Sequence, residues 1–222
     1  MPPPRAINPE DKQRKRDSIL DAASHLWSTQ TDCISSMDAL AQASGVAKGT
    51  LYLYFRSKEE VLLGLHERDV TNFFNQVIAR AQQPEPMQLE ELGDIVVASI
   101  RRSPTFLPLS NLCTGLMERQ LPIAVSLEFK QRTFAHLDDV VSALQQHFPT
   151  MTCMKMMQGY ALMLGLWQLL QQHGLLAHDE LPEELLRLPC NAAVDSERFL
   201  QILHNALCNL FTGLLAQKDD AA

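Results

Sequence analysis

The sequence lacks a hydrophobic run long enough to cross a membrane. Its most apolar stretch is the eleven residues Tyr160–Leu170, which Gln168 interrupts, whereas a spanning helix needs about 20 apolar residues. The N-terminal residues 1–16 have no apolar run after their charges, so they do not have the form of a signal peptide. We therefore expect a cytoplasmic protein that has no membrane among its partners.

Cysteine is scarce and scattered. An odd number of widely spaced thiols, without a CxxC pair, favours free cysteines in a reducing compartment over disulfides or a zinc site. The seven histidines are equally dispersed, and the sequence has no phosphate-binding loop and no nucleophile–base spacing. We expect no metal, no cofactor and no enzymatic activity. The five cysteines are Cys33, Cys113, Cys153, Cys190 and Cys208.

The chain also lacks the excess of positive charge that nucleic-acid-binding proteins usually carry. Its 222 residues hold 19 Lys and Arg against 26 Asp and Glu, a formal net charge of −7. The charges are unevenly divided, however. Residues 1–58 hold 8 basic and 6 acidic side chains, whereas residues 59–222 hold 11 and 20. Because the N-terminal part is slightly positive, the overall acidity does not exclude DNA as a partner for that part.

Strand-like alternation is almost absent, and apolar residues recur instead at helical spacing. The pattern predicts an all-α protein of about nine helices whose ends are marked by proline and glycine. We interpret residues 174–193, which contain two prolines and several acids, as a long connection. The predicted helices cover approximately residues 9–29, 37–44, 48–54, 58–83, 89–103, 107–118, 123–147, 150–173 and 195–217.

Residues 37–54 have the spacing of a helix-turn-helix, and Ser36 precedes them as the expected N-cap of the first helix. Ala41 provides the small side chain that two steeply crossing helices need, and Gly45 accepts a positive φ at the sharp turn. Leu40, Val46 and Leu51 fall where three apolar side chains close the small core between the helices. The spacing favours a DNA-binding element, although other pairs of short amphipathic helices share it.

The sequence GVAKGTLYLYFRSKEEVL, from Gly45 to Leu62, extends this motif, and ILDAASHLW precedes it at residues 19–27. Both segments resemble the signature of the TetR family of bacterial transcriptional regulators, and the resemblance covers about residues 15–64. Residues 33–35 depart from the family, which often has a glycine, an aromatic residue and a threonine there. Beyond residue 65 only the helical pattern is similar.

The resemblance implies that the first turn of the second helix faces the bases of the major groove. A lysine there can donate to guanine O6 and N7, and a threonine can contact a thymine methyl group. Tyrosine hydroxyls and helix N-termini suit phosphates. Tyr52 has the alternative of packing in the core, and Lys48 that of solvation. The implied DNA-binding residues are Ser36, Lys48, Gly49, Thr50, Tyr52, Tyr54 and Lys58.

We expect three parts along the chain. Residues 1–9 form a flexible arm, residues 10–58 the helix-turn-helix DNA-binding domain, and residues 59–222 a helical bundle for ligand binding and dimerisation. The basic residues between 5 and 16 have two interpretations, either a contact with the DNA or a solvated tail.

The helices predicted at about 150–173 and 195–217 are apolar on more than one face. Such helices can pair with their two-fold mates in a four-helix bundle, so we expect a homodimer through them and a pseudo-palindromic DNA operator.

The middle helices are expected to enclose a pocket for a small-molecule effector. Because methionine-rich apolar linings suit flexible hydrophobic ligands, we expect this effector to be lipophilic. Each of these side chains has the alternative of ordinary core packing. The candidate ligand-binding residues are Phe106, Leu109, Cys113, Met117, Phe129, Phe134, Met163 and Trp167.

Two functions fit these features. The first is a repressor of transcription that a small effector releases from its operator by a shift between two conformations. The alternative is a DNA-binding scaffold whose helical body docks a protein partner. A ligand pocket in the body favours the first, and a solid core favours the second.

Overall fold

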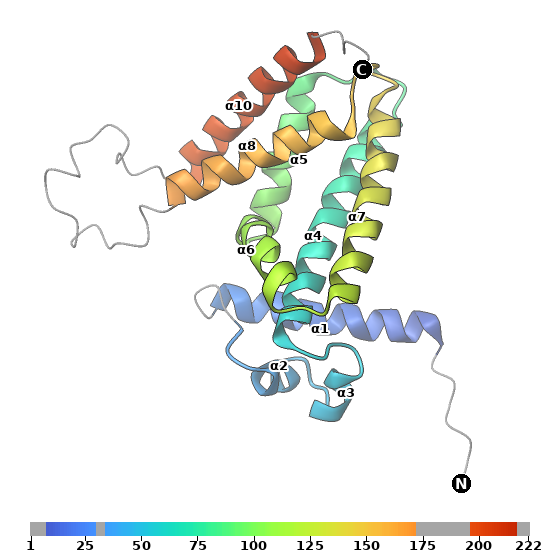
Figure 1. The fold of residues 1–222 in the computed structure, drawn as a ribbon, viewed down its shortest axis with the longest axis vertical. Coiled ribbons are helices and arrows are strands. Elements are labelled where there is room, and N and C mark those ends of the chain that lie inside the picture. Colours follow the sequence, from blue (N-terminus) through green and yellow to red (C-terminus); the bar gives the residue numbers. More distant parts are fainter. Residues whose placement is uncertain (1–7, 30–33, 172–195, 217–222) are drawn as a thin grey trace, which may run out of the picture. The chain divides into compact units, whose positions relative to one another are not determined.

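The computed structural model describes residues 8–29, 34–171 and 196–216 (Figure 1). Within these ranges the chain forms nine α-helices and no strand, which confirms the prediction of an all-α fold. Residues 1–7 of the expected arm and the whole of the connection at 174–193 lie outside the described residues. The helices are α1 (Pro9–Thr29), α2 (Met37–Ala43), α3 (Lys48–Tyr52), α4 (Lys58–Ala81), α5 (Leu89–Arg102), α6 (Phe106–Arg119), α7 (Ile123–Leu144), α8 (Cys153–Gln171) and α10 (Ser196–Ala216).

The helices form two compact units. The first consists of the described residues of Met1–Asp69 together with Pro104–Phe129, and the second consists of Val70–Ser103 and the described residues of Lys130–Ala222. Helices α4 and α7 each contribute residues to both units. These units divide the chain differently from the domains expected at 10–58 and 59–222, which stay a prediction about function.

The first unit has an apolar core formed by residues at helical spacing. Polar contacts also join its segments: Arg68 of α4 donates a hydrogen bond of 2.7 Å to Asp21 of α1, and the Arg16 guanidinium lies 5.2 Å from the centre of the Phe55 ring. Burying a leucine-sized side chain contributes roughly 1.5–3 kcal/mol, so this core holds the short helices α2 and α3 in place. The core contains Ile19, Leu20, Ala23, Trp27, Ile34, Leu40, Ala41, Leu51, Phe55, Val61, Leu62, Leu63, Leu65, Leu109, Cys113 and Phe129.

In the second unit, α10 packs against α5 and α8. Glycine permits both close approaches: a Cβ atom on Gly93 would lie 2.8 Å from Cδ2 of His204, and one on Gly159 would lie 2.7 Å from Cζ of Phe211. By length and composition alone α10 would be able to cross a membrane, a property that core helices of soluble proteins share. Leu203 and Phe211 are among its buried residues.

His66 of α4 is a polar side chain in the apolar core of the first unit. It is 4% exposed, its ring lies 5.9 Å from that of Phe129, and no described residue offers its Nδ1 a hydrogen bond. Removal from water disfavours the charged imidazolium, so burial lowers the pKa of His66 from 6.5 to about 4.

This depressed pKa predicts that the protein loses stability in mild acid. Between pH 6.5 and 4 the unfolded chain binds a proton at His66 and the native chain does not, so the free energy of unfolding falls as pH falls. The loss is about 2 kcal/mol from pH 7.5 to 5. Urea unfolding at the two pH values measures it, and His66→Leu should flatten the dependence while a change at exposed His25 should not. A dependence that His66→Leu leaves intact would refute the assignment.

Candidate nucleic-acid interface

The cap and the turn of the helix-turn-helix have the expected geometry. The Ser36 side chain caps α2 by accepting a hydrogen bond of 3.1 Å from the Ala39 amide, at an N-cap with φ −160° and ψ 162°. Gly45 takes φ 65° in the turn, a left-handed conformation that favours glycine. The Val46 amide then donates to the Ala41 carbonyl over 3.1 Å, which closes the turn between α2 and α3.

The core beneath the motif is closed by the residues that the spacing predicts. Leu40 and Leu51 are completely buried, Ala41 is 7% exposed, and Val46 packs against the same cluster. Because α3 has only five residues, too few for a stable isolated helix, its position depends on Leu51. The orientation of the predicted reading helix is therefore set by packing.

The predicted DNA-binding residues lie on the surface or near it. Lys48 and Gly49 are exposed in the first turn of α3, and a Cβ atom on Gly49 would meet nothing within 4 Å. Tyr52 is 42% exposed, which places it outside the core. Tyr54 is half-buried and packs against the core cluster. Of the remaining predicted residues, Ser36 is exposed and Thr50 and Lys58 are half-buried.

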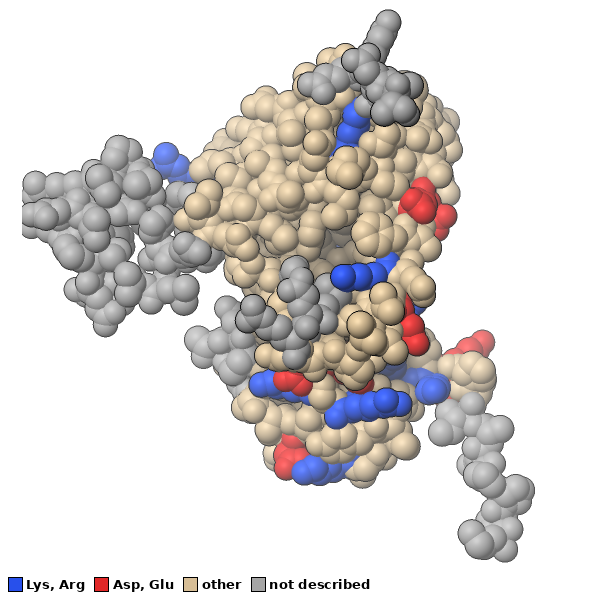
Figure 2. Space-filling model, in the orientation of Figure 1, with Lys and Arg blue, Asp and Glu red and all other residues tan. Residues whose placement is uncertain are grey.

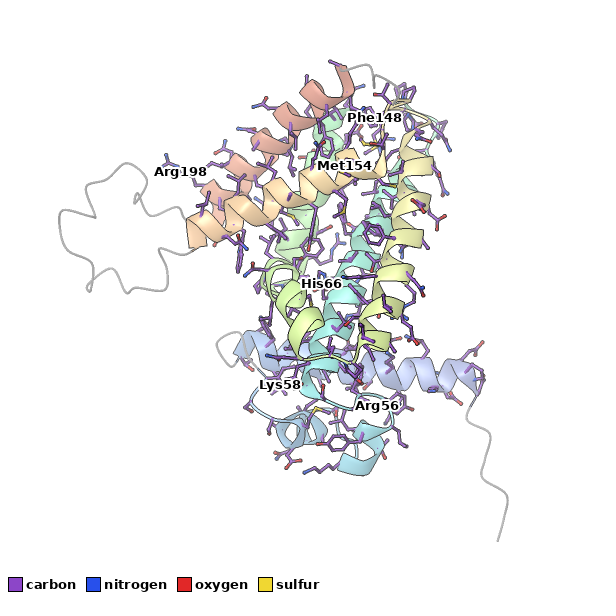
Figure 3. All side chains as sticks on the ribbon, in the orientation of Figure 1. Arg56, Lys58, His66, Phe148, Met154 and Arg198 are labelled. Atoms are coloured by element: carbon purple, nitrogen blue, oxygen red, sulfur yellow. The ribbon has the colours of Figure 1, made fainter. Side chains whose placement is uncertain are left out.

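Two basic residues, Arg56 and Lys58, flank the start of α4, whose first turn also carries Glu59 and Glu60. Ser57 Oγ accepts a hydrogen bond of 3.3 Å from the Glu60 amide, and Glu60 Oε2 accepts one of 2.7 Å from the Arg56 amide. These bonds fix the corner between α3 and α4. Arg56 and Lys58 lie beside this corner, with His66 further along the helix (Figure 3). Arg56 is exposed, and our sequence reasoning did not single it out.

Lys48 is held by an acidic residue of the preceding helix. Its Nζ lies 2.6 Å from Oδ1 of Asp38 in α2, and both side chains are more than half exposed, at 58% and 66%. The hydrogen bond and the charge of Asp38 raise the pKa of Lys48, so the ammonium stays charged. Sequence reasoning missed Asp38 because its contact with Lys48 depends on the crossing of two helices.

Positive charge does not dominate the first unit on the face that Figure 2 shows. Basic and acidic side chains lie next to one another over its helices, without one unbroken basic patch. Non-specific attraction to DNA scales with the number of phosphates that basic side chains neutralise. This surface therefore suits binding through a few placed contacts.

The candidate ligand-binding residues divide between the two units. Phe106, Leu109, Cys113 and Phe129 are buried in the first unit, and the last three belong to the core cluster that supports the helix-turn-helix. Burial raises the pKa of the Cys113 thiol to about 12, so it is an unreactive packing residue.

In the second unit, Met163 is 5% exposed, Trp167 is half-buried and Phe134 is 50% exposed. The Met117 side chain lies outside the described residues. Among the described residues, no group of three metal-binding side chains comes together.

Two family models match this chain. Residues 19–65 match bacterial regulatory proteins of the tetR family, and residues 67–218 match a tetracyclin repressor-like C-terminal domain. The first match contains the whole helix-turn-helix with the residues predicted from Ser36 to Lys58. The second covers more than half of the chain.

Individual relatives are more distant. The fatty acid metabolism regulator protein of Bacillus subtilis is 32% identical over 68 residues, which are 31% of this chain and about a third (35%) of that protein's length. The fatty acid degradation regulator FadR from Bacillus halodurans has 18% identity and a TM-score of 0.50, over 86% of this chain and 97% of that one. A transcriptional regulator from Aquifex aeolicus has 18% identity and a TM-score of 0.47, over 90% and 99%.

Proposed function

The chain belongs to the TetR family of DNA-binding transcriptional regulators, and from this we propose that it is a repressor released from its operator by a small lipophilic effector. The observation that carries the proposal is the helix-turn-helix, in which packing at Leu51 and the turn at Gly45 present Lys48 and Thr50 on α3. Membership of a family of transcriptional regulators supports a role without catalysis. We place the protein in the cytoplasm, where its DNA would be.

The operator contacts follow from where each side chain lies. Lys48 and Thr50 approach base edges in the major groove, because they occupy the first turn of the reading helix. Tyr52, Tyr54 and Lys58 contact phosphates, as does the amide-rich N-terminus of α2 at Ser36. Gly49 allows the backbone to come close to the DNA, since no side chain stands between them.

The protein works as a homodimer in this proposal. Members of the family bind operators and typically dimerise, and α8 carries exposed apolar side chains that a partner helix would cover: Met154 is 68%, Met157 38% and Leu169 65% exposed. The dimer is formed through α8 and α10, the helices expected at 150–173 and 195–217. Two-fold symmetry then calls for a pseudo-palindromic operator.

The effector is proposed to be of the fatty-acyl class. Two relatives are named for the regulation of fatty acid metabolism or degradation. A flexible acyl chain has the lipophilic character that the sequence predicts for the effector. Release would be a population shift in which the effector prefers the conformation that DNA disfavours, with α4 linking the DNA-binding and ligand-binding domains.

A binding experiment with the DNA upstream of the protein's own gene tests the proposal. We expect the purified protein to retard this duplex but not a scrambled one, and a long-chain fatty acid to release it while a short-chain acid has no effect. The length dependence follows because each buried CH₂ group contributes about 0.8 kcal/mol. Retention of the duplex at every concentration of long-chain acid would contradict an acyl-released repressor.

One observation favours the alternative, a scaffold whose body docks a protein. Three apolar side chains are exposed along α7: Ile123 is 79%, Leu127 53% and Phe134 50% exposed. Their spacing of four and seven residues puts them on one face of the helix. Under this alternative, changing Leu127 to Asp leaves operator binding and its response to acids intact but abolishes association with the partner.

A further inference from the structure

We propose that Asp38 is a specificity-determining residue: it holds the Lys48 ammonium for one base contact and at the same time weakens binding to DNA of other sequences. The inference rests on the proposed operator contact of Lys48. It concerns a residue of α2 that is not itself among the predicted DNA contacts.

The geometry joins the two helices of the motif. Asp38 lies in the first turn of α2 and Lys48 in the first turn of α3, and their side chains meet at 2.6 Å. Both are exposed, so no burial forces them together. The backbone beneath the pair is fixed by the Ser36 cap, the Gly45 turn and the Leu51 contact in the core. Asp38 therefore holds its carboxylate at a defined point beside the reading helix.

Lys48 can bond to Asp38 and to a base at the same time. An ammonium group has three N–H donors. With one donated to Asp38, two remain, which is the number needed for O6 and N7 of a guanine. A lysine side chain that is already held also loses less conformational freedom on binding, and this loss otherwise costs about 0.5–1.5 kcal/mol per side chain. Asp38 thus prepares Lys48 for a base contact.

The negative charge of Asp38 acts against all other DNA. The Asp38 carboxylate repels phosphates that approach Lys48, and its hydrogen bond engages the ammonium group that would otherwise contact a phosphate of any sequence. Since the repulsion is present on every duplex and the base contact only on the operator, the pair lowers non-specific affinity more than operator affinity. Specificity is the ratio of these affinities.

Asp38→Asn tests the inference, because it removes the charge and keeps the size of the side chain. The probes are the duplex that wild-type protein selects from a random-sequence pool and an unrelated duplex of equal length. We expect Asp38→Asn to bind the unrelated duplex about 3- to 10-fold more tightly and to lose about fivefold or more in the ratio of the two affinities. The slope of log affinity for the unrelated duplex against log salt should steepen by about 0.9 per subunit.

Asp21→Asn is the matched control. Asp21 of α1 is 75% exposed and pairs with Arg68 of α4 at 2.7 Å, so the variant removes the same charge from an ion pair outside the helix-turn-helix and outside the basic residues between 5 and 16. It should leave the affinity ratio unchanged. In a Lys48→Ala background, Asp38→Asn should no longer change which sequence is selected, because the residue it positions is gone. A merely structural role at the start of α2 would alter thermal unfolding but would not depend on Lys48.

The outcomes separate the two proposals. If Lys48→Ala weakens operator binding but Asp38→Asn leaves the affinity ratio unchanged, the inference about Asp38 fails and the proposed function stands. If Lys48→Ala leaves operator binding unchanged, the proposed contact itself is wrong and the inference falls with it. The inference is supported if the affinity ratio falls for Asp38→Asn, stays constant for Asp21→Asn, and does not respond to Asp38→Asn when Lys48 is alanine.

Discussion

Replacing Lys48 with alanine is expected to weaken operator binding by about 5- to 150-fold for each half-site, because a good paired contact to a guanine contributes about 1–3 kcal/mol of discrimination. In a two-fold dimer the two half-sites are far apart, so the losses of binding free energy at the two sites add. Stability should hardly change, since the Lys48 side chain is 58% exposed and its single ion pair lies at the surface. The measurement is a titration of a fluorescent operator duplex.

The control for this variant is Lys130→Ala, which removes the same charge from an exposed position on α7. It should leave operator affinity within about twofold of wild type, because it lies outside the helix-turn-helix. If Lys48→Ala lowers the affinity for the operator and for an unrelated duplex by the same factor, Lys48 contacts a phosphate and not a base. Unchanged binding would remove Lys48 from the interface altogether.

The helix-turn-helix could be predicted almost residue by residue because its signals are local. A cap at Ser36, a positive φ at Gly45 and the burial of Leu40 and Leu51 each depend on residues within one or two turns of the chain. Boundaries were less accurate: the helix predicted at 123–147 ends at Leu144. Beyond Leu144 the amides of Gln146 and His147 donate to carbonyls three residues back instead of four, so the chain leaves the α-helix through a tighter turn.

Contacts between distant segments were not predictable in the same way. Nothing in the spacing indicates that α6 and the start of α7 join the core of the first unit, or that Asp38 reaches Lys48. Both depend on how helices cross, which packing in three dimensions decides. A pocket lining and a solid core also require the same apolar residues, so sequence alone did not distinguish ligand contacts from core residues such as Leu109 and Cys113.

His66 illustrates the same limit for a titratable group. In the sequence it is one of seven dispersed histidines, and its neighbours Leu65 and Glu67 do not reveal whether its own side chain is buried. Its position opposite Phe129, a residue 63 places later, decides that it is removed from water. Long-range packing thereby sets the pH range in which the protein is expected to be stable.

Leu51→Ala is expected to reduce the stability of the first unit by about 2–5 kcal/mol, the range for removing a fully buried leucine side chain. Such a loss is a large fraction of the roughly 5–15 kcal/mol that stabilises a typical protein. Because α3 is too short to form by itself, its ordering should be lost before the rest of the unit unfolds. Operator binding should then fall together with hydrogen-exchange protection of the α2 and α3 amides.

Leu53→Ala, two residues further along the chain, is the control for Leu51→Ala. Leu53 follows α3 and is 76% exposed, whereas Leu51 is completely buried, so the same chemical change should alter stability by no more than about 0.5 kcal/mol. Urea unfolding of the two variants measures the difference. If both variants lose the same stability, α3 does not depend on the Leu51 contact, and the orientation of Lys48 must be set by something other than the core beneath it. If only Leu51→Ala loses stability and this variant still binds the operator as tightly as wild type, then DNA binding, and not the core, orders α3.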